Sequence, residues 1–380
     1  MKVLVIFSYK YSLFTWASVG NIYREMEYYK ELSQKNDIEF TFLTYGSSED
    51  QTFLEGYENI NLIPVYKLIN KSNYQFVNLI KSFFIPFLIR SRLKDIDLIK
   101  CIQLNGSWVG ILLKLITGKP LFIKTGFDAY IFSKNENKSI IKKALFYLLT
   151  QAGLLFSDLY SVASKYDYDF INKKYFFVNK PKLIVRPNWV FPNKQIVNNS
   201  LDQYENRVIS IGRLTEQKNY PYIIKSLSNS HYSLDIVGNG EQKEELIKLA
   251  KECNTNLNLL GNIDNDELLD LLPKYKYFVL ASYFEGNPKV VLEAMAAGCL
   301  VLVSNIPNNE EIIINNVNGF TFNIIDEDHR EIIRIIESTS NEVNYKKIRE
   351  NSIKQVNEKY SFEGTCSEEF NDYLMLINIE

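Results

Sequence analysis

Short runs of β-branched and other apolar residues alternate with helical stretches along the whole 380-residue chain. Helical stretches such as 22–35 and 138–153 separate these runs. Strands are expected in the first half at 3–7, 39–45, 98–104, 120–125 and 158–164, and in the second half at 207–212, 233–238, 257–261, 277–282 and 300–305. This alternation is typical of βαβ units with parallel strands, so it predicts an α/β protein with two successive Rossmann-like domains.

The join between the domains is predicted near residues 186–194, where two prolines and two asparagines interrupt regular structure. This places the first domain at 1–188 and the second at 189–360. The net charge is +9 over residues 1–189 and −11 over the remainder, which indicates that the two domains face different partners.

Several classes of protein are disfavoured by composition. No apolar run approaches the ~18 residues of a membrane-spanning helix, and the N-terminus is too interrupted for a signal peptide. Four scattered cysteines (101, 253, 299 and 366) indicate neither disulfides nor zinc, so a cytoplasmic protein is expected. The overall charge of −2 argues against nucleic acid as a partner.

One stretch, FEGNPKVVLEAMAAG at 284–298, combines a helix with an isolated carboxylate. A helix is predicted from Pro288 to Ala297, with Gly298 ending it. Its body is apolar on every side except at Glu293, which predicts a buried helix. A buried carboxylate needs a partner, so Glu293 is a candidate functional residue.

Three loops that follow predicted strands should meet at one sheet edge, where open parallel sheets bind ligands. Arg213 and Lys218 bring two cations suited to a diphosphate, and the helix start at Gly286-Asn287 also attracts anions. Glu285 and Glu293 are compatible with a nearby diphosphate if each accepts hydrogen bonds from sugar hydroxyls. Alternatively, Glu293 forms a buried ion pair with Arg213 or Lys218. The joint pattern favours the ligand site.

These motifs resemble those of a known family. GRLTEQKN (212–219) and EGNPKVVLEAMAAG (285–298) are similar to the paired signatures of the retaining, nucleotide-sugar-dependent glycosyltransferases of the GT-B fold, family 4, also called glycosyl transferases group 1. Glu285 and Glu293 match the E-x7-E motif of that family. The similarity continues through 237–246, 259–272, 310–320 and 187–190, and it is diffuse in the first half, at 18–20 and 125–128.

The resemblance implies two Rossmann-like domains whose parallel sheets face across a cleft, with a final helix at 361–380 crossing back to the first domain. It also implies retaining transfer of a sugar from a UDP- or GDP-sugar to a glycan or lipid-linked acceptor, in polysaccharide or lipopolysaccharide synthesis. No metal or other cofactor is implied.

The resemblance also implies roles for individual residues. Arg213 and Lys218 would neutralise the leaving diphosphate, Glu293 would bind the ribose, and Glu285 the donated sugar. Gly20 would let a first-domain loop approach the diphosphate. The remaining donor contacts would come from Gly238, Asn262, Ile263, Gly286, Asn287, Pro288 and Val290.

The chain departs from the family where members often carry His in an H-G-x-D stretch, because Thr125-Gly126-Phe127-Asp128 stands here. Thr125 or Asp128 would then contact the sugar or acceptor, or Asp128 would only cap the following segment. His231 and His329 match no motif. A non-catalytic nucleotide-sugar-binding partner therefore remains as an alternative function. A nucleotide-sugar epimerase of the same fold is the other alternative, although the scarcity of histidines in the first half argues against its acid/base chemistry.

Two further patterns carry weaker predictions. Four Asp-x-Asp triplets could attract Mg²⁺ or Mn²⁺, but structural roles are expected for all of them: Asp95/Asp97, Asp167/Asp169, Asp264/Asp266 and Asp326/Asp328. Residues 66–94 carry six basic residues, no acidic residue and many Phe and Ile. Such a segment either contacts an anionic membrane surface, which we favour, or forms ordinary helices over the first sheet.

Overall fold

The computed structural model describes residues 1–380 except 177–181, 192–203, 326–328, 340–341 and 379–380. The chain divides into two compact units. Unit 1 comprises Met1–Pro187 together with Thr365–Glu380, and unit 2 comprises Asn188–Gly364. Unit 1 is therefore built from both ends of the sequence given.

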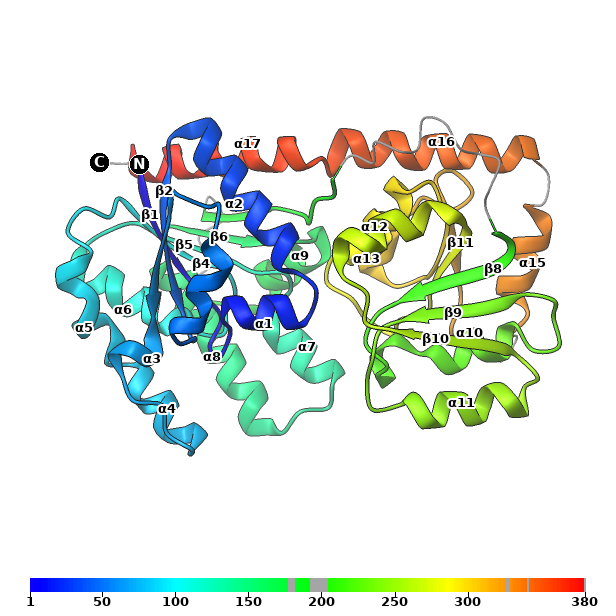
Figure 1. The fold of residues 1–380 in the computed structure, drawn as a ribbon, viewed down its shortest axis with the longest axis horizontal. Coiled ribbons are helices and arrows are strands. Elements are labelled where there is room, and N and C mark those ends of the chain that lie inside the picture. Colours follow the sequence, from blue (N-terminus) through cyan, green and yellow to red (C-terminus); the bar gives the residue numbers. More distant parts are fainter. Residues whose placement is uncertain (177–181, 192–203, 326–328, 340–341, 379–380) are drawn as a thin grey trace. The chain divides into compact units, whose positions relative to one another are not determined.

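A seven-stranded parallel sheet forms the centre of unit 1, with strand order β3-β2-β1-β4-β5-β6-β7 (Figure 1). The strands are β1 Lys2–Ile6, β2 Glu39–Thr44, β3 Ile60–Pro64, β4 Leu98–Cys101, β5 Leu121–Lys124, β6 Leu159–Val162 and β7 Leu183–Val185. In the central register, Leu4 lies opposite Thr41 on one side and Ile99 on the other. Nearly all residues of β1 and β4 are buried, as expected for strands covered on both faces.

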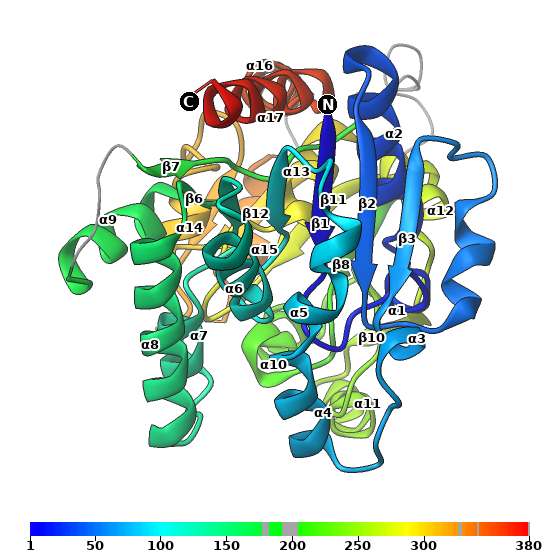
Figure 2. The same ribbon diagram turned by 90° about the vertical axis from the view of Figure 1, so that its left-hand side faces the viewer.

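Four helices of unit 1 begin at polar side chains that accept backbone hydrogen bonds: Ser12 before α1, Asp128 before α7, Ser139 before α8 and Ser164 before α9. They are α1 Leu13–Ser18, α2 Ile22–Asn36, α3 Val65–Leu68, α4 Gln75–Ser82, α5 Ile85–Ile89, α6 Ser107–Thr117, α7 Ala129–Asn135, α8 Ile140–Phe156, α9 Lys165–Lys174 and most of α17 Phe362–Ile377. Helix α6 packs between α5 and α8 over one face of the sheet (Figure 2).

Unit 2 contains a six-stranded parallel sheet of order β10-β9-β8-β11-β12-β13. Its strands are β8 Tyr204–Ile211, β9 Ser233–Val237, β10 Asn256–Gly261, β11 Tyr275–Leu280, β12 Leu300–Ser304 and β13 Phe320–Phe322. Its helices are α10 Tyr220–Ser226, α11 Lys243–Glu252, α12 Asn265–Leu271, α13 Lys289–Ala296, α14 Pro307–Glu310, α15 Glu331–Ser338 and α16 Glu342–Lys359.

Residues of the central strands of unit 2 alternate between two apolar layers. Ile209 and Phe278 belong to one layer, whereas their neighbours Val208 and Val279 belong to the other. Because successive side chains of a strand point to opposite faces, both faces must be apolar when helices cover both. This explains why the strands read as continuous apolar runs in the sequence.

The predicted α/β class with two parallel sheets is confirmed, and each of the ten predicted strands is present. Three strands were missed: β3, β7 and β13. β3 has five residues, is interrupted by Asn61 and ends in a proline, while β7 and β13 have only three residues each. Runs this short carry little periodic signal.

A buried ion-pair cluster joins α17 to the sheet of unit 1. Glu369 of α17 accepts hydrogen bonds from Lys100 of β4 and from Lys124 of β5, the latter at 2.7 Å. The Tyr373 hydroxyl donates to Glu369 at 2.5 Å. Burial alone would raise the pKa of Glu369, but the Lys100 and Lys124 ammonium groups outweigh burial and hold that pKa well below its usual range.

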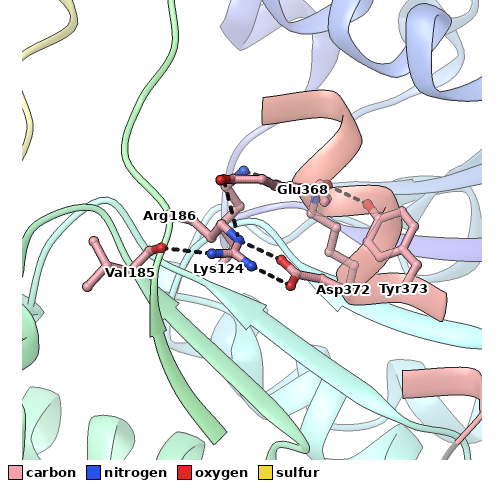
Figure 3. A network of polar contacts seen from close by, with 8 residues as sticks. Lys124, Val185, Arg186, Glu368, Asp372 and Tyr373 are labelled. Carbon is pink, nitrogen blue, oxygen red and sulfur yellow. Dashed lines mark hydrogen bonds and ion pairs between the residues drawn. The ribbon is translucent and has the colours of Figure 1, made fainter. Parts of the chain in front are cut away.

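A second ion pair joins the same helix to the end of β7. The Arg186 guanidinium donates through Nε and Nη2 to the two carboxylate oxygens of Asp372, at 2.8 and 2.7 Å (Figure 3). Parallel donation to both oxygens is the strongest geometry available to an arginine and a carboxylate. Helix α17 is thus attached to unit 1 through charged groups on three strands or strand ends.

Candidate functional site

The loops after β8 and β9 lie in direct contact at the carboxyl edge of the unit 2 sheet. Gly212 N donates to Val237 O at 2.9 Å, and Leu214 N donates to Asn239 O at 3.0 Å. Gly238 has φ +136°, and a Cβ there would lie 2.1 Å from the Gly212 carbonyl oxygen. This approach requires glycine at 238 and leaves backbone groups accessible at the sheet edge.

The loop after β11 joins the same place. Tyr283 N donates to Gln217 O at 2.9 Å, and the Gln217 side-chain amide donates to Phe284 O at 2.8 Å. The three loops of the sequence prediction therefore lie together, because parallel strands end at one edge of a sheet.

Lys218 and Glu285 form an ion pair at this junction. Lys218 ends the 3-10 turn Glu216–Lys218, and its Nζ lies 2.6 Å from Glu285 Oε1. Their side chains are only 13% and 9% exposed, so solvent screens the pair weakly. Burial raises the pKa of the nearby Tyr220 hydroxyl, and the Glu285 charge raises it further. The two predicted site residues are thus held side by side.

Glu293 is buried within α13, at 3% exposure, with Val291, Leu292 and Ala294 also buried around it. Its Oε1 accepts a hydrogen bond from the Asn265 side-chain amide at 3.2 Å. Because Lys218 pairs with Glu285, the alternative ion pair between Lys218 and Glu293 is not the arrangement observed. Asn265, the first residue of α12, therefore helps satisfy the carboxylate in this helix.

The start of α13 is fixed from outside the helix. Asn188 N donates to Asn287 Oδ1 at 2.9 Å, and the Asn188 side-chain amide donates to Asn287 O at 2.5 Å. Pro288 occupies the N-cap position and makes no side-chain cap hydrogen bond, so the first amide groups of α13 lack a side-chain acceptor there. Gly298, with φ +76°, follows the helix end, as predicted.

The other predicted donor residues of unit 2 surround this centre. The Arg213 side chain is exposed, next to the Gly212–Gly238 contact. Ile263 and Val290 pack half-buried on the same apolar layer as α13, whereas Asn262 is exposed. Gly286 is buried ahead of the helix.

A surface hollow of unit 2 lies beside the three loops and is lined by Glu216, Gln242 and Tyr283 among others. None of the predicted charged residues Arg213, Lys218, Glu285 and Glu293 lines it. The hollow is therefore a neighbour of the predicted donor site and is not that site.

Thr125 and Asp128 of unit 1 are both occupied by contacts of the fold. Thr125 is 2% exposed, and its hydroxyl donates to Ser161 O at 3.0 Å. Asp128 caps α7 by accepting from Ile131 N at 2.8 Å, and it also accepts from the Tyr175 hydroxyl at 2.9 Å. Burial raises the pKa of Asp128 to about 6 despite these bonds. Of the two roles predicted for Asp128, capping is the one observed.

Gly20 lies in unit 1 with φ +72°, between α1 and α2. Helix α1 separates its loop from β1. The positive φ explains the glycine, and its predicted approach to a diphosphate stays a prediction.

The Asp-x-Asp pairs occupy ordinary structural positions wherever the structure describes them. Asp97 Oδ2 accepts from Lys2 N at 2.8 Å, Asp167 and Asp169 lie in α9, and Asp264 is the N-cap of α12. Asp326 and Asp328 lie outside the described residues. Among the described residues, no three His, Cys, Asp or Glu side chains cluster as metal ligands would. In the same residues, no helix has the length and apolar character needed to cross a membrane.

Comparisons with known proteins agree with this arrangement. The family model described as "Glycosyl transferases group 1" matches residues 193–355. A relative from Campylobacter jejuni, an alpha-1,4-N-acetyl-D-galactosaminyltransferase named for a diNAcBac-PP-undecaprenol-linked glycan, is 26% identical over 59% of this chain and 62% of its own length. The O-antigen biosynthesis glycosyltransferase WbnH from Escherichia coli is 29% identical over 62% of this chain and 67% of its own length. The chain thus spans less than two thirds of the first of these relatives.

A solved structure shows the same fold over nearly the whole chain. The crystal structure of Anabaena Alr3699/HepE in complex with UDP and glucose superposes with a TM-score of 0.74, covering 98% of this chain and 99% of that one, at 15% identity. At this identity the similarity establishes the fold, which is GT-B.

Sequence reasoning missed three polar residues of the site. Asn188 holds Asn287, Asn265 holds Glu293, and Gln217 joins two loops. Each lies inside a stretch that the resemblance had already marked. A signal was therefore present, but an asparagine or glutamine shows no partner until the fold brings one near.

Proposed function

We propose that this chain transfers a sugar from a nucleoside diphosphate to an acceptor hydroxyl, because residues 193–355 match the model of glycosyl transferases group 1 and the fold is GT-B. The epimerase and the non-catalytic partner are not favoured, since the named relatives are transferases. The observation that carries the proposal is the Lys218–Glu285 pair, held where three loops of unit 2 meet.

The donor diphosphate would bind between the loop after β8 and the start of α13. The Lys218 ammonium lies 2.6 Å from the Glu285 carboxylate, and a bound diphosphate would give this ammonium a second negatively charged partner. Arg213 is exposed and positioned on the same loop. The amide groups at the start of α13 and the helix dipole add positive potential. Cations and amides together would stabilise the charge of the leaving diphosphate without a metal ion.

The two glutamates would hold the sugars of the donor. Carboxylates accept strong hydrogen bonds from hydroxyl groups, and a ribose and a transferred sugar each offer such hydroxyls. Glu285 would bind the transferred sugar, since it sits at the loop ahead of α13, and Glu293 would bind the ribose from inside the helix. Asn265 already donates to Glu293 and would fix its orientation.

The reaction would proceed with retention of the anomeric configuration. The C–O bond between sugar and diphosphate breaks through an oxocarbenium-like state, and the acceptor hydroxyl enters on the face that the diphosphate leaves. Its proton passes to the departing phosphate oxygen, so the products are a glycoside and a nucleoside diphosphate. The neighbouring cations favour this step because they stabilise the developing negative charge.

We assign the donor to UDP- or GDP-sugars and the acceptor to a glycan or lipid-linked glycan of cell-surface polysaccharide synthesis. UDP is the nucleotide in the Anabaena structure of the same fold. The named relatives belong to O-antigen synthesis or act on an undecaprenol-linked glycan. Both statements concern those proteins, and they guide the choice of substrates to test.

A panel of UDP- and GDP-sugars, with and without an extract of lipid-linked glycans, tests the proposal. We expect slow release of free nucleotide from one donor and acceleration by the extract. Conversion of the sugar without release of nucleotide would instead identify an epimerase, and binding without either reaction would identify a non-catalytic partner.

The site itself is tested by Lys218→Ala, with Lys248→Ala as a matched control. Lys248 lies on α11 of the same unit, is 80% exposed, and has its Nζ 3.8 Å from the carboxylate of Glu252 on the same helix. We expect Lys218→Ala to lower turnover about 10²–10³-fold while the control keeps wild-type turnover. Wild-type turnover of Lys218→Ala would remove Lys218 from the mechanism.

A further inference from the structure

Unit 1 exposes an unusual number of large apolar side chains on α4, α5 and α8. On α4 and α5 these include Phe76, Phe84 and Phe87, and on α8 they include Ile140, Ile141 and Leu145. Their exposed fractions run from 53% for Phe87 to 84% for Ile140. Together they present an apolar area on the order of several hundred Å², a size that marks interaction sites on soluble proteins.

Helix α6 connects these helices in the described structure. Helix α6 packs between α5 and α8, and the junction of α4 and α5 is attached to α6 by a stack of Phe83 on Trp108 at 5.6 Å. The Trp108 indole also donates to Ser82 Oγ at 2.9 Å. In Figure 2, α4 and the lower end of α8 extend to the same end of the unit. We call the exposed face of α4, α5 and α8 the apolar face.

The charges on these helices are of one sign. Residues 66–94, which contain α4 and α5, hold six basic and no acidic residues. Helix α8 holds two charged residues, Lys142 and Lys143. Only three of its 17 residues are buried, namely Thr150, Gly153 and Leu154. A protein partner that covered these helices would need an apolar patch surrounded by acidic side chains. An anionic lipid surface offers apolar chains and negatively charged headgroups together.

We propose that the apolar face rests on an anionic lipid bilayer, with its aromatic and aliphatic side chains in the interface and its lysines and arginines on lipid phosphates. An anionic lipid suits the apolar face because its apolar side chains lie among basic groups, with no acidic residue on the same helices. A role for this contact in reaching a lipid-linked acceptor rests on the proposed function. The surface itself is argued from unit 1 alone.

The strand direction adds to the argument. Helix α8 precedes β6 and runs opposite to the parallel strands, so its first residues, Ile140 and Ile141, lie towards the carboxyl ends of the strands. Ligands of open parallel sheets bind at that end. A bilayer on the apolar face would therefore lie beside the end of unit 1 where an acceptor is expected.

Flotation of the full chain with vesicles tests the proposal. Vesicles of phosphatidylglycerol and phosphatidylcholine in equal parts are compared with vesicles of phosphatidylcholine alone. We expect co-flotation with the anionic vesicles, weakened by salt, and little with the neutral ones. The variant Lys142→Gln/Lys143→Gln should bind roughly 25-fold more weakly, at about fivefold per lysine. Phe84→Ser/Phe87→Ser should lose at least tenfold.

Ile325→Ser is the matched control, because Ile325 is 87% exposed but belongs to unit 2. It should bind the anionic vesicles like the wild type, and all variants should keep the wild-type melting temperature. Equal flotation with both kinds of vesicle, no flotation, or an equal loss in the control would overturn the proposal. So would a dimer in solution that Phe84→Ser/Phe87→Ser separates, since a second copy would then cover the face. Nucleotide release without vesicles is measured in parallel, so that failure of the transferase proposal is seen separately.

Discussion

Replacing Glu369 with glutamine removes the one carboxylate that Lys100 and Lys124 share while keeping its shape. Lys100 is 1% exposed and lies between the rings of Tyr28, Tyr29 and Tyr373, whereas Lys124 is 23% exposed and can turn to solvent. The loss therefore falls on Lys100, which is left as a buried ammonium without the carboxylate that accepts its hydrogen bond, although the Glu25 charge still raises its pKa. Breaking such a pair costs about 3–5 kcal/mol.

Deprotonation of Lys100 sets an upper limit on the loss of unfolding free energy. Lys100 can escape the penalty by losing its proton, and from an ordinary pKa of 10.5 this costs at most about 5 kcal/mol at pH 7. We therefore expect Glu369→Gln to lower the free energy of unfolding of unit 1 by about 3–5 kcal/mol. This is a large part of the 5–15 kcal/mol that typically stabilises a domain.

The pH dependence of stability gives an independent readout. Burial lowers the pKa of Lys100 to about 8 although Glu369 raises it. At Lys100 the unfolded chain binds more protons than the folded one between this pKa and 10.5, so this group makes the wild type more stable as pH rises above about 8. Without Glu369 the pKa of Lys100 falls further, and the gain should begin at lower pH, with a slope of up to about 1.4 kcal/mol per pH unit.

Urea unfolding followed by tryptophan fluorescence measures both quantities. A Trp189→Phe background leaves Trp16 and Trp108, which report on unit 1. Asp169→Asn, which breaks the exposed pair with Lys165, is the matched control and should change stability by less than about 1 kcal/mol. A loss below 1 kcal/mol in Glu369→Gln, with an unchanged pH profile, would refute the reasoning. Lys100→Met/Glu369→Leu should recover much of the loss.

Three further predictions concern single residues. Glu293→Gln should weaken UDP binding about tenfold by titration calorimetry, because charge-assisted hydrogen bonds to hydroxyls are lost, and unchanged affinity would contradict the role of Glu293. Asp128 has a folded pKa of about 6 against 3.8 in the unfolded chain, so the folded state binds more protons in this window and its stability falls by about 1–3 kcal/mol as pH rises from 3.8 to 6. Asp128→Asn should lack that fall in urea titrations, and equal slopes in both proteins would contradict the burial of a titrating Asp128. Gly238→Ala should cost at least 3 kcal/mol, because its Cβ would meet Gly212 O at 2.1 Å, whereas Gly261→Ala, with φ +73° and open space, should cost about 1 kcal/mol; equal losses would show that the close approach is not needed.

The sheets were predictable because their strands are buried on both faces. Runs such as 3–7 and 300–303 are apolar without interruption, and such runs between helices indicate parallel strands. β7 and β13, at three residues each, fall below the length at which a pattern can be recognised. Each of these strands lies at an edge of its sheet, β7 beside β6 and β13 beside β12.

The candidate site was predictable in its charges but not in its contacts. Parallel topology alone brings Lys218 and Glu285 to one edge, so their proximity could be expected from the loops they occupy. Their pairing with each other, and the pairing of Glu293 with Asn265, depends on distances that no spacing rule supplies. The sequence is compatible with two roles for Asp128; the structure shows the cap, at 2.8 Å from Ile131 N, and contact with a sugar or acceptor stays a prediction.

The discontinuity of unit 1 has a consequence for biosynthesis. Residues 365–380 complete this unit, yet all of Asn188–Gly364 emerges from the ribosome before them. At typical translation speeds that interval lasts on the order of ten to forty seconds. During it, β4 and β5 carry Lys100 and Lys124 while their carboxylate has not yet been made. Unit 2 is continuous, so its whole sequence has been synthesised before the last segment of unit 1, and it can complete its native contacts first.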